Sequence, residues 1–150
     1  MSTQQCILLL GSNLGNTKKN ILSAIDLIGE RAGTILTKSE FLYSDPEEFA
    51  SSHKFCNIAL ILNTQLSPAR LLMALKDIER QMGRTEDSGI TGEYEDRVID
   101  IDIVSYGNVC FQSKRLTLPH LKHCFEREFS RVLLEDLNKK SNDLTELYFR

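Results

Sequence analysis

The chain lacks the features that mark several large classes of protein. Its 150 residues carry 18 basic and 21 acidic side chains, so the excess of positive charge with which proteins bind nucleic acid is missing. The sequence shows no run long and apolar enough to span a membrane, and no signal peptide. We therefore expect a cytoplasmic protein with neither a nucleic-acid nor a membrane partner.

Cysteine is also sparse, and its spacing argues against cysteine-based sites. The four cysteines form no Cys-x-x-Cys pair: Cys6, Cys56, Cys110 and Cys124. This arrangement favours reduced thiols that pack as small buried hydrophobic side chains. Segment 120–124 holds two histidines and a cysteine, but it has neither zinc spacing nor a second half-site. The sequence therefore argues against a zinc site.

What the sequence does contain is a regular succession of apolar patterns. Because 41% of its residues are hydrophobic and no repeat or low-complexity linker interrupts them, residues 1–150 suit one domain with a substantial core. The patterns predict strands at 6–10, 35–43, 55–64 and 98–106, and helices around 21–32, 67–83, 126–137 and 144–149. This order predicts an α+β protein with a ferredoxin-like β-α-β-β-α-β core, an antiparallel sheet and a C-terminal helical extension.

The most informative segment is the predicted strand at 98–106, because two carboxylates interrupt its apolar run. Alternate residues of a strand share a face, so Asp100 and Asp102 point the same way, about 6–7 Å apart. Two acids on an otherwise apolar strand are costly unless a positive group compensates them, and Mg²⁺ carrying a phosphate chain is the usual solution. The alternative is a half-exposed strand whose polar face is acidic. Both interpretations stay open at this point.

Other candidate residues carry weaker signals. The turn at 11–15, between a strand and a helix, could present backbone N–H groups to an anion or could be a plain turn. Arg84 and Arg97 could reach phosphates, or could serve as a helix-terminal cation and a salt bridge to a neighbouring acid. Phe55 and Asn57 share one face of a strand and suit a flat heterocycle, although a core phenylalanine beside a polar strand end is the simpler interpretation.

In their order and combination these segments resemble the 6-hydroxymethyl-7,8-dihydropterin pyrophosphokinases, a family of folate-pathway enzymes. The resemblance runs in family order over about residues 6 to 130. The matching segments are GSNLGN at 11–16, Tyr43-x-x-Pro46, Phe55-x-Asn57, Ile78-Glu79 before Gly83-Arg84, Arg97-x-x-Asp100-x-Asp102-x-x-x-Tyr106-Gly107, and Leu116-x-x-Pro119-His120. The Arg-x-x-Asp-x-Asp segment followed by Pro-His is the most specific of them.

The resemblance implies an ATP-dependent pyrophosphokinase. Its members transfer the β,γ-pyrophosphoryl group of ATP to the hydroxymethyl oxygen of the pterin and release AMP. By similarity, Asp100 and Asp102 would hold two Mg²⁺ ions that bridge the triphosphate and orient an in-line attack. Asp102 is the better candidate to help activate the hydroxyl through the metal. Arg84 and Arg97 would complete the catalytic group.

The resemblance also divides the remaining candidates between the two substrates. Arg84, Arg97 and His120 would contact the ATP phosphates, and Glu79 would lie near the nucleotide. Substrate binding would involve Phe55 and Phe129, which sandwich the pterin ring, together with Asn57 at the ring edge and Pro46.

The chain departs from the family most clearly at 85–96. This segment carries five acids and no basic residue, and Glu86 stands where the family commonly has an arginine. Two other functions therefore remain as rivals: a two-metal nucleotidyl transferase or cyclase on a ferredoxin-like core, and a pterin-binding relative with impaired turnover. We expect a monomer, with a homodimer as the alternative.

Overall fold

The computed structural model describes residues 2–44, 54–83, 97–120 and 128–141. The elements are, in chain order, β1 (Gln4–Ser12), α1 (Thr17–Arg31), β2 (Thr34–Lys38), β3 (Leu42–Ser44), β4 (Phe55–Thr64), α2 (Pro68–Gln81), β5 (Asp100–Tyr106), β6 (Phe111–Gln112), β7 (Thr117–Leu118) and α4 (Glu128–Ser141). The main sheet has the order β2-β4-β1-β5, with β3 also pairing with β4. All of its pairings are antiparallel, which confirms the predicted ferredoxin-like core.

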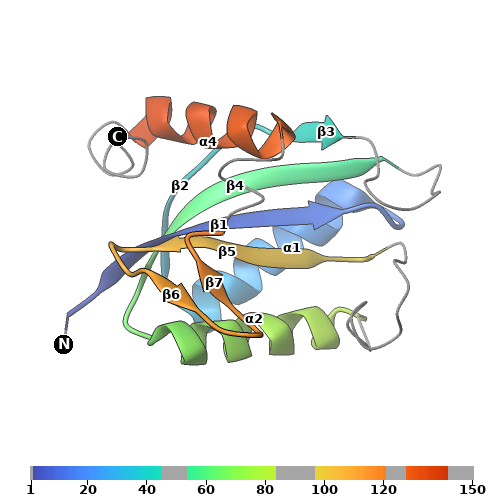
Figure 1. Cartoon of the computed structure of the whole chain (residues 1–150). Helices are drawn as coiled ribbons and strands as arrows, with labels where there is room; N and C mark the ends of the chain where they lie inside the picture. Colours follow the sequence, from blue (N-terminus) through green and yellow to red (C-terminus); the bar gives the residue numbers. More distant parts are fainter. Residues whose placement is uncertain (1, 45–53, 84–96, 121–127, 142–150) are drawn as a thin grey trace.

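Two helices cover one face of this sheet, and one helix covers part of the other (Figure 1). α1 begins after Asn16, whose side chain accepts a hydrogen bond from the backbone of Lys19. α2 begins after Ser67, whose hydroxyl accepts a hydrogen bond from the backbone N–H of Arg70. Pro68 is the first residue of the helix, as the sequence predicts. Both helices turn their apolar stripes towards the sheet.

The alternation of side chains along β1, β4 and β5 separates two hydrophobic clusters. Towards α1 and α2 the sheet contributes Cys6, Leu8, Leu10, Cys56, Ile58, Leu60, Leu62, Ile101 and Ile103. Towards α4 the apolar residues are fewer: Ile7, Leu9, Ala59, Ile61 and Val104 meet Leu133, Leu134 and Leu137 of α4. The α4 face is therefore apolar over only part of the length of its strands.

The predicted strand at 35–43 is wrong in one respect, because β2 and β3 are separate strands that pair successively with β4. Between them, Ser39 donates its backbone N–H to Ala59 O at 2.8 Å, and its Oγ accepts the Ala59 N–H at 2.9 Å. The serine side chain replaces a backbone partner at this point. The register with β4 consequently shifts between the two strands.

The remaining predicted elements agree with the structure within a few residues. β4 matches the predicted strand at 55–64, whereas β5 begins at Asp100 and the helix predicted at 126–137 runs to Ser141. Residues 126–127 and the predicted terminal helix at 144–149 lie outside the described residues. Within the described ranges, none of the helices has both the length and the apolar character that crossing a bilayer requires.

The cysteines follow the prediction only in part. Cys6 and Cys56 are buried free thiols, and burial raises the pKa of Cys6 to about 12, which keeps it protonated at neutral pH. Cys110 is exposed, so the expectation that it is a buried hydrophobic residue is wrong. Cys124 and His123 lie outside the described residues.

Candidate functional site

The candidate site lies where the apolar part of the α4 face ends. In the register of the sheet, Gly11 of β1 pairs with Asn57 of β4 on one side and with Asp100 of β5 on the other. The alternation along each strand points these three positions to the α4 face. Since neighbouring strands lie about 4.8 Å apart, Asn57 and Asp100 stand roughly 10 Å apart across the glycine. Asp102 follows on the same face of β5, next to Leu9.

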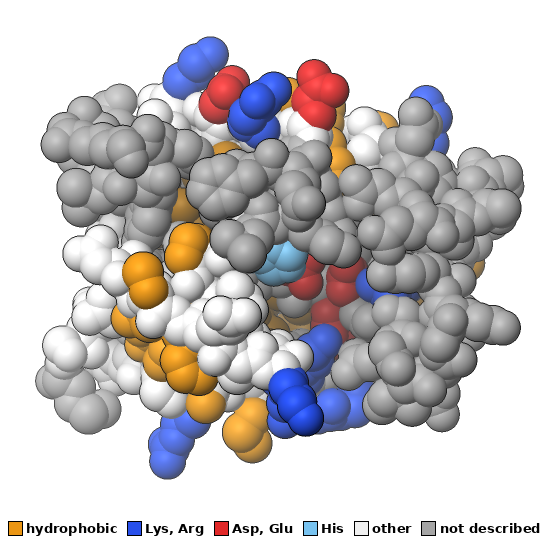
Figure 2. All heavy atoms as spheres, viewed as in Figure 1, with side chains coloured by type: hydrophobic (Ala, Val, Ile, Leu, Met, Phe, Trp, Pro, Cys, Tyr) orange, Lys and Arg blue, Asp and Glu red, His pale blue; other side chains and the backbone are white. Residues whose placement is uncertain are grey.

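Asn57, Gly11 and Asp100 form a row across the three strands, and Gly11 leaves its middle position without a side chain. A Cβ atom at this position would lie 3.0 Å from Asn57 Oδ1 and 3.4 Å from Phe55 Cδ1. The side chains of β4 therefore lean over the glycine, in space that another residue would occupy. In Figure 2, acidic side chains and a histidine side chain line a hollow on this side of the molecule.

The acidic side of the site is partly compensated within the protein. Arg97 Nη1 lies 3.2 Å from Asp100 Oδ2, and the two side chains are 14% and 25% exposed. This is the salt bridge that the sequence left open as an alternative for Arg97. Asp100 and Asp102 both stay partly exposed, so the ion pair leaves them accessible to a ligand. The phosphate contact expected for Arg97 stays a prediction.

The start of β5 is fixed by a residue that sequence reasoning missed. Asn13 donates its backbone N–H to Arg97 O at 3.0 Å, and its side-chain Oδ1 accepts the Arg97 N–H at 2.7 Å. Asn20 in turn bonds Ser12 Oγ and Leu14 O. These bonds favour a structural role for the 11–15 turn. The signal available in the sequence was an asparagine in a turn, because its side chain can bond backbone groups there.

Glu79 and His120 both approach β5 from its outer edge. The Glu79 carboxylate, only 1% exposed, accepts the N–H of Ile101 through Oε2 at 2.7 Å. The backbone N–H of His120 donates to Val104 O at 2.7 Å. Both contacts are made to backbone groups beside the two aspartates. The nucleotide and phosphate contacts expected of Glu79 and His120 stay predictions.

On the other side of Gly11, the orientation of Asn57 is fixed by its partners. Its Nδ2 donates to Leu42 O at 3.1 Å and to Ser44 Oγ at 2.8 Å, and the residue is 3% exposed. Because a carbonyl can only accept, the amide nitrogen has to face β3, and Oδ1 therefore faces Gly11. Asn57 thus offers a ligand an acceptor. Phe55 is half-buried beside it, which fits the binding role better than the core role.

Phe129 comes to this side of the sheet from α4. It is half-buried and packs, together with Leu42, against the cluster beneath α4. Phe55 and Phe129 thus both belong to the α4 side of the sheet, as a sandwich of a flat ring requires. A direct contact of either ring with a ligand stays a prediction.

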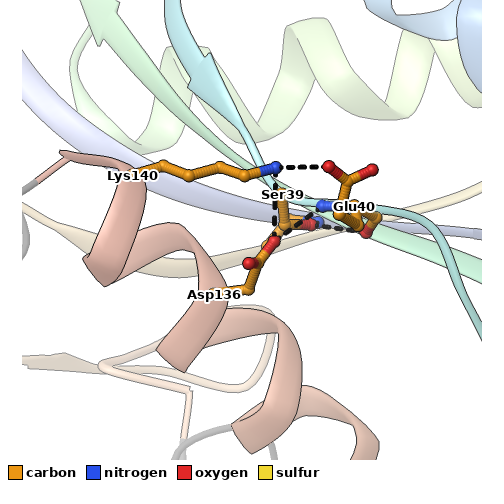
Figure 3. Close-up of polar contacts among 5 residues, drawn as sticks. Ser39, Glu40, Asp136 and Lys140 are labelled. Carbon is orange, nitrogen blue, oxygen red and sulfur yellow. Dashed lines mark hydrogen bonds and ion pairs between the residues drawn. The ribbon is translucent and has the colours of Figure 1, made fainter.

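A polar clamp ties α4 to the connection between β2 and β3 (Figure 3). Asp136 Oδ2 accepts the backbone N–H of Glu40 at 2.8 Å. Lys140 Nζ lies 2.9 Å from Glu40 Oε1 and 3.5 Å from Asp136 Oδ2, and its hydrogen bond to Glu40 raises the pKa of Lys140. Ser39 completes the clamp by donating its hydroxyl to Glu40 O. The clamp lies on the helix that carries Phe129 and beside the strand that holds Asn57.

The residues of β5 fit a magnesium site of the type that substrate phosphates complete. Asp100 and Asp102 present two carboxylates on one face, and within the described ranges no group of three or more His, Cys, Asp or Glu could form an all-protein metal cage. Mg²⁺ characteristically takes one or two carboxylates together with phosphate oxygens and water. The donor set therefore fits the ion. Arg84, Pro46 and the acidic segment 85–96 lie outside the described residues.

Comparison with known proteins gives a consistent result. Residues 7–139 match the model of the 7,8-dihydro-6-hydroxymethylpterin-pyrophosphokinase family. A Porphyromonas gingivalis protein named 2-amino-4-hydroxy-6-hydroxymethyldihydropteridine pyrophosphokinase is 40% identical over 133 residues, which is 87% of this chain and 88% of that protein. A protein of the same name from Haemophilus influenzae is 33% identical, over 85% of this chain and 78% of its own length.

Two longer proteins contain a region similar to this chain. The mitochondrial folate synthesis bifunctional protein of Pisum sativum is 37% identical over 89% of this chain, but that match spans 25% of the plant protein. The wild-type Plasmodium falciparum HPPK-DHPS crystal structure with pteroate superposes with a TM-score of 0.68 over 99% of this chain and 44% of that one. At 16% identity this last match supports the fold alone.

Proposed function

The chain belongs to the 7,8-dihydro-6-hydroxymethylpterin-pyrophosphokinase family, and from this membership we infer its reaction. It transfers pyrophosphate from ATP to 6-hydroxymethyl-7,8-dihydropterin and releases AMP, a step of folate biosynthesis. One observation of the structure supports this best: the row Asn57, Gly11, Asp100 puts a ring-edge acceptor and an acidic strand on one face, with a glycine between them.

We propose that the pterin lies on the Asn57 side of this row. Asn57 Oδ1 accepts a hydrogen bond from an N–H group of the pterin edge, since its amide nitrogen is already engaged by β3. Phe55 and Phe129 stack on the two faces of the ring and exclude water from it. Pro46, which lies outside the described residues, completes the substrate group as a prediction from the resemblance.

The triphosphate then extends over β5. Asp100 and Asp102 would hold two Mg²⁺ ions, and Arg97, Arg84 and His120 would contact the phosphate oxygens. When bound, Mg²⁺ supplies the positive charge that neutralises the reacting phosphates. The pterin hydroxymethyl oxygen attacks the β-phosphorus and releases its proton to water, and the bond from that phosphorus to the oxygen it shares with the α-phosphate breaks. AMP leaves with that oxygen.

The roughly 10 Å between Asn57 and Asp100 suits this division of the site. A dihydropterin ring bonded at one edge to Asn57 carries its hydroxymethyl group on the far end of the ring. That group therefore points along the row towards β5. In this proposal the register of the three strands brings the hydroxyl close to the acidic strand.

The test is incubation with ATP, Mg²⁺ and 6-hydroxymethyl-7,8-dihydropterin, followed by chromatography of nucleotides and pterins. We expect equal amounts of AMP and pterin diphosphate. Sustained ADP would contradict the pyrophosphokinase, and release of free pyrophosphate would select the nucleotidyl transferase. Pterin binding without consumption of ATP would select the relative with impaired turnover.

We further propose that the chain acts as one domain, as a monomer in the cytoplasm. The supporting observation is that the site is assembled from β1, β3, β4, β5 and α4 of a single chain. Size-exclusion chromatography with light scattering tests the oligomeric state, and a homodimer with unchanged activity would correct that part alone.

A further inference from the structure

Glu79 is a buried carboxylate in an unusual place. It lies on the face of α2 that packs against β5, among the apolar residues Leu75 and Ile78 of the same helix. Placing a charge in such surroundings is costly unless hydrogen bonds and an opposite charge compensate it. The compensation comes from Ile101 N at 2.7 Å and from Lys76 Nζ at 3.4 Å.

The backbone contact falls at a decisive point of β5. Among the described strands of the main sheet, β5 lies at the end of the order and pairs with β1, so the N–H groups along its other edge need partners from elsewhere. Ile101 is the residue between Asp100 and Asp102, and its side chain is buried beneath the sheet. The Glu79 carboxylate therefore binds the backbone N–H of the residue that separates the two aspartates, whose side chains project on the opposite face.

A second contact holds the same edge further along. Val104 is the bulged residue of β5, because Ser105 pairs with Ile7 and Ile103 with Leu8. Its carbonyl accepts the His120 N–H at 2.7 Å. The edge of β5 is thus held on both sides of Asp102, by Glu79 before it and by His120 after it.

We propose that Glu79 is a positioning residue that acts through the Ile101 N–H and fixes the direction in which Asp100 and Asp102 face the phosphates. The inference rests on the proposed function and replaces a direct nucleotide contact as the role of Glu79. Glu79 is 1% exposed and one of its carboxylate oxygens is bonded to β5, so the carboxylate faces the strand and not the solvent. The Ile101 N–H needs an oxygen acceptor at this distance, which a carboxylate or an amide can supply.

Two conservative variants distinguish the positioning role of Glu79 from a direct contact with the nucleotide. Glu79→Gln keeps an oxygen at the same reach but removes the charge, whereas Glu79→Asp keeps the charge but withdraws the oxygens by one methylene. If Glu79 positions the strand, the glutamine variant keeps kcat within about threefold, and the aspartate variant loses about 10- to 100-fold, the usual range for groups that orient metal ligands. A direct nucleotide contact through charge predicts the reverse order. The matched control is Lys76→Met, which leaves the Ile101 contact intact and should stay within about twofold.

A readout independent of turnover completes the test. Amide hydrogen exchange of Ile101, followed by NMR on the protein without substrates, should accelerate at least tenfold in Glu79→Asp and change little in Glu79→Gln. The KM for the pterin should stay within about twofold in both, because Phe55 and Asn57 belong to β4. Unchanged exchange at Ile101 in the aspartate variant, or a glutamine variant with the larger loss of kcat, would overturn the positioning role. Failure of the proposed function appears separately, as absence of AMP formation by the parent protein.

Discussion

The two faces of the same three strands differ in how completely the described helices cover them. Towards α1 and α2, the side chains of β1, β4 and β5 form a continuous apolar surface that runs from Cys6 to Leu10 on β1 and from Cys56 to Leu62 on β4. Towards α4, the apolar surface ends at Leu9, Ala59 and Val104, and the next positions along the strands are Gly11, Asn57 and Asp102. The first face accounts for most of the core, and we propose that the chemistry takes place at the end of the other face that the described helices leave open.

This difference has a simple physical cause. Polar side chains on a sheet are tolerated where water or a ligand reaches them, and they are costly beneath a packed helix. Among the described residues, the buried carboxylate on the covered side is Glu79, which is compensated by a backbone N–H and a lysine. Substitutions on the two faces should therefore affect different quantities.

The largest effect is expected on the acidic strand. Asp100→Ala and Asp102→Ala should each lower kcat by roughly 10³-fold, because phosphate charge loses its compensation. The thermal midpoint should stay the same or rise in Asp102→Ala, since the repulsion between the two carboxylates is relieved. It should fall in Asp100→Ala, because Arg97 loses its ion pair. Steady-state kinetics and calorimetric unfolding measure the two quantities. Near-normal turnover in both variants would remove these residues from the reaction.

The second test uses the covered face of the same sheet. Leu60→Ala should lower the free energy of unfolding by about 2–5 kcal/mol, because it opens a cavity beneath α1 and α2. Activity per folded molecule should change little. Denaturant titration combined with active-site-normalised rates measures both. If this variant lost turnover as the aspartate variants do, the separation between the two faces would be wrong.

The third test concerns the pterin side of the row. Phe55→Ala should weaken pterin binding by roughly 1–3 kcal/mol through lost stacking and burial, and Asn57→Ala should weaken it by leaving the ring edge without its acceptor. Calorimetric titration measures both, and ATP affinity should serve as the unchanged control. Equal losses of affinity for ATP and for the pterin would mean that the two substrates do not bind at opposite ends of the row, as proposed.

Gly11→Ala sharpens the same comparison with a single methyl group. The new Cβ would lie 3.0 Å from Asn57 Oδ1, so the amide has to shift by a few tenths of an ångström. We expect pterin affinity to fall by about tenfold, roughly 1.4 kcal/mol, while the fold is kept. A matched control is Gly29→Ala on α1, where a Cβ meets nothing within 4 Å. Unchanged pterin affinity in the first variant would place the ring elsewhere.

The smallest effect is expected at the clamp that holds α4. Asp136→Ala removes the acceptor of the Glu40 N–H and should cost about 0.5–1.5 kcal/mol of stability, with a modest rise in the KM for the pterin through Phe129. Asp136→Asn keeps an acceptor and should recover most of the loss. Lys140→Met should cost under about 1 kcal/mol, because its ion pairs are exposed. Equal behaviour of the alanine and asparagine variants would show that the backbone contact is unimportant.

Local patterns predicted much of this architecture. The period of two along β5 placed Asp100 and Asp102 on one face, and the Ser67-Pro68 cap placed the start of α2. Both signals depend on neighbouring residues alone. The same is true of β4, whose apolar run matches the strand from Phe55 to Thr64.

The contacts that the sequence did not reveal join residues far apart in the chain. Asn13 holds Arg97 across 84 positions, Glu79 holds Ile101 across 22, and the break at Ser39 depends on its pairing with Ala59. The closeness of Gly11 to Asn57 likewise follows from strand register. Register is set by the whole sheet, so no local pattern contains it.

The central proposal is that pyrophosphate is transferred at the end of the α4 face that carries Asn57, Gly11 and Asp100. Phosphorus NMR of the parent protein with ATP, Mg²⁺ and 6-hydroxymethyl-7,8-dihydropterin, run beside Asp102→Ala, tests it most directly. The account predicts that the signals of AMP and of a pterin diphosphate grow together in the parent sample and stay absent in the variant. Growth of ADP or free pyrophosphate in the parent, or equal AMP formation by Asp102→Ala, would contradict it.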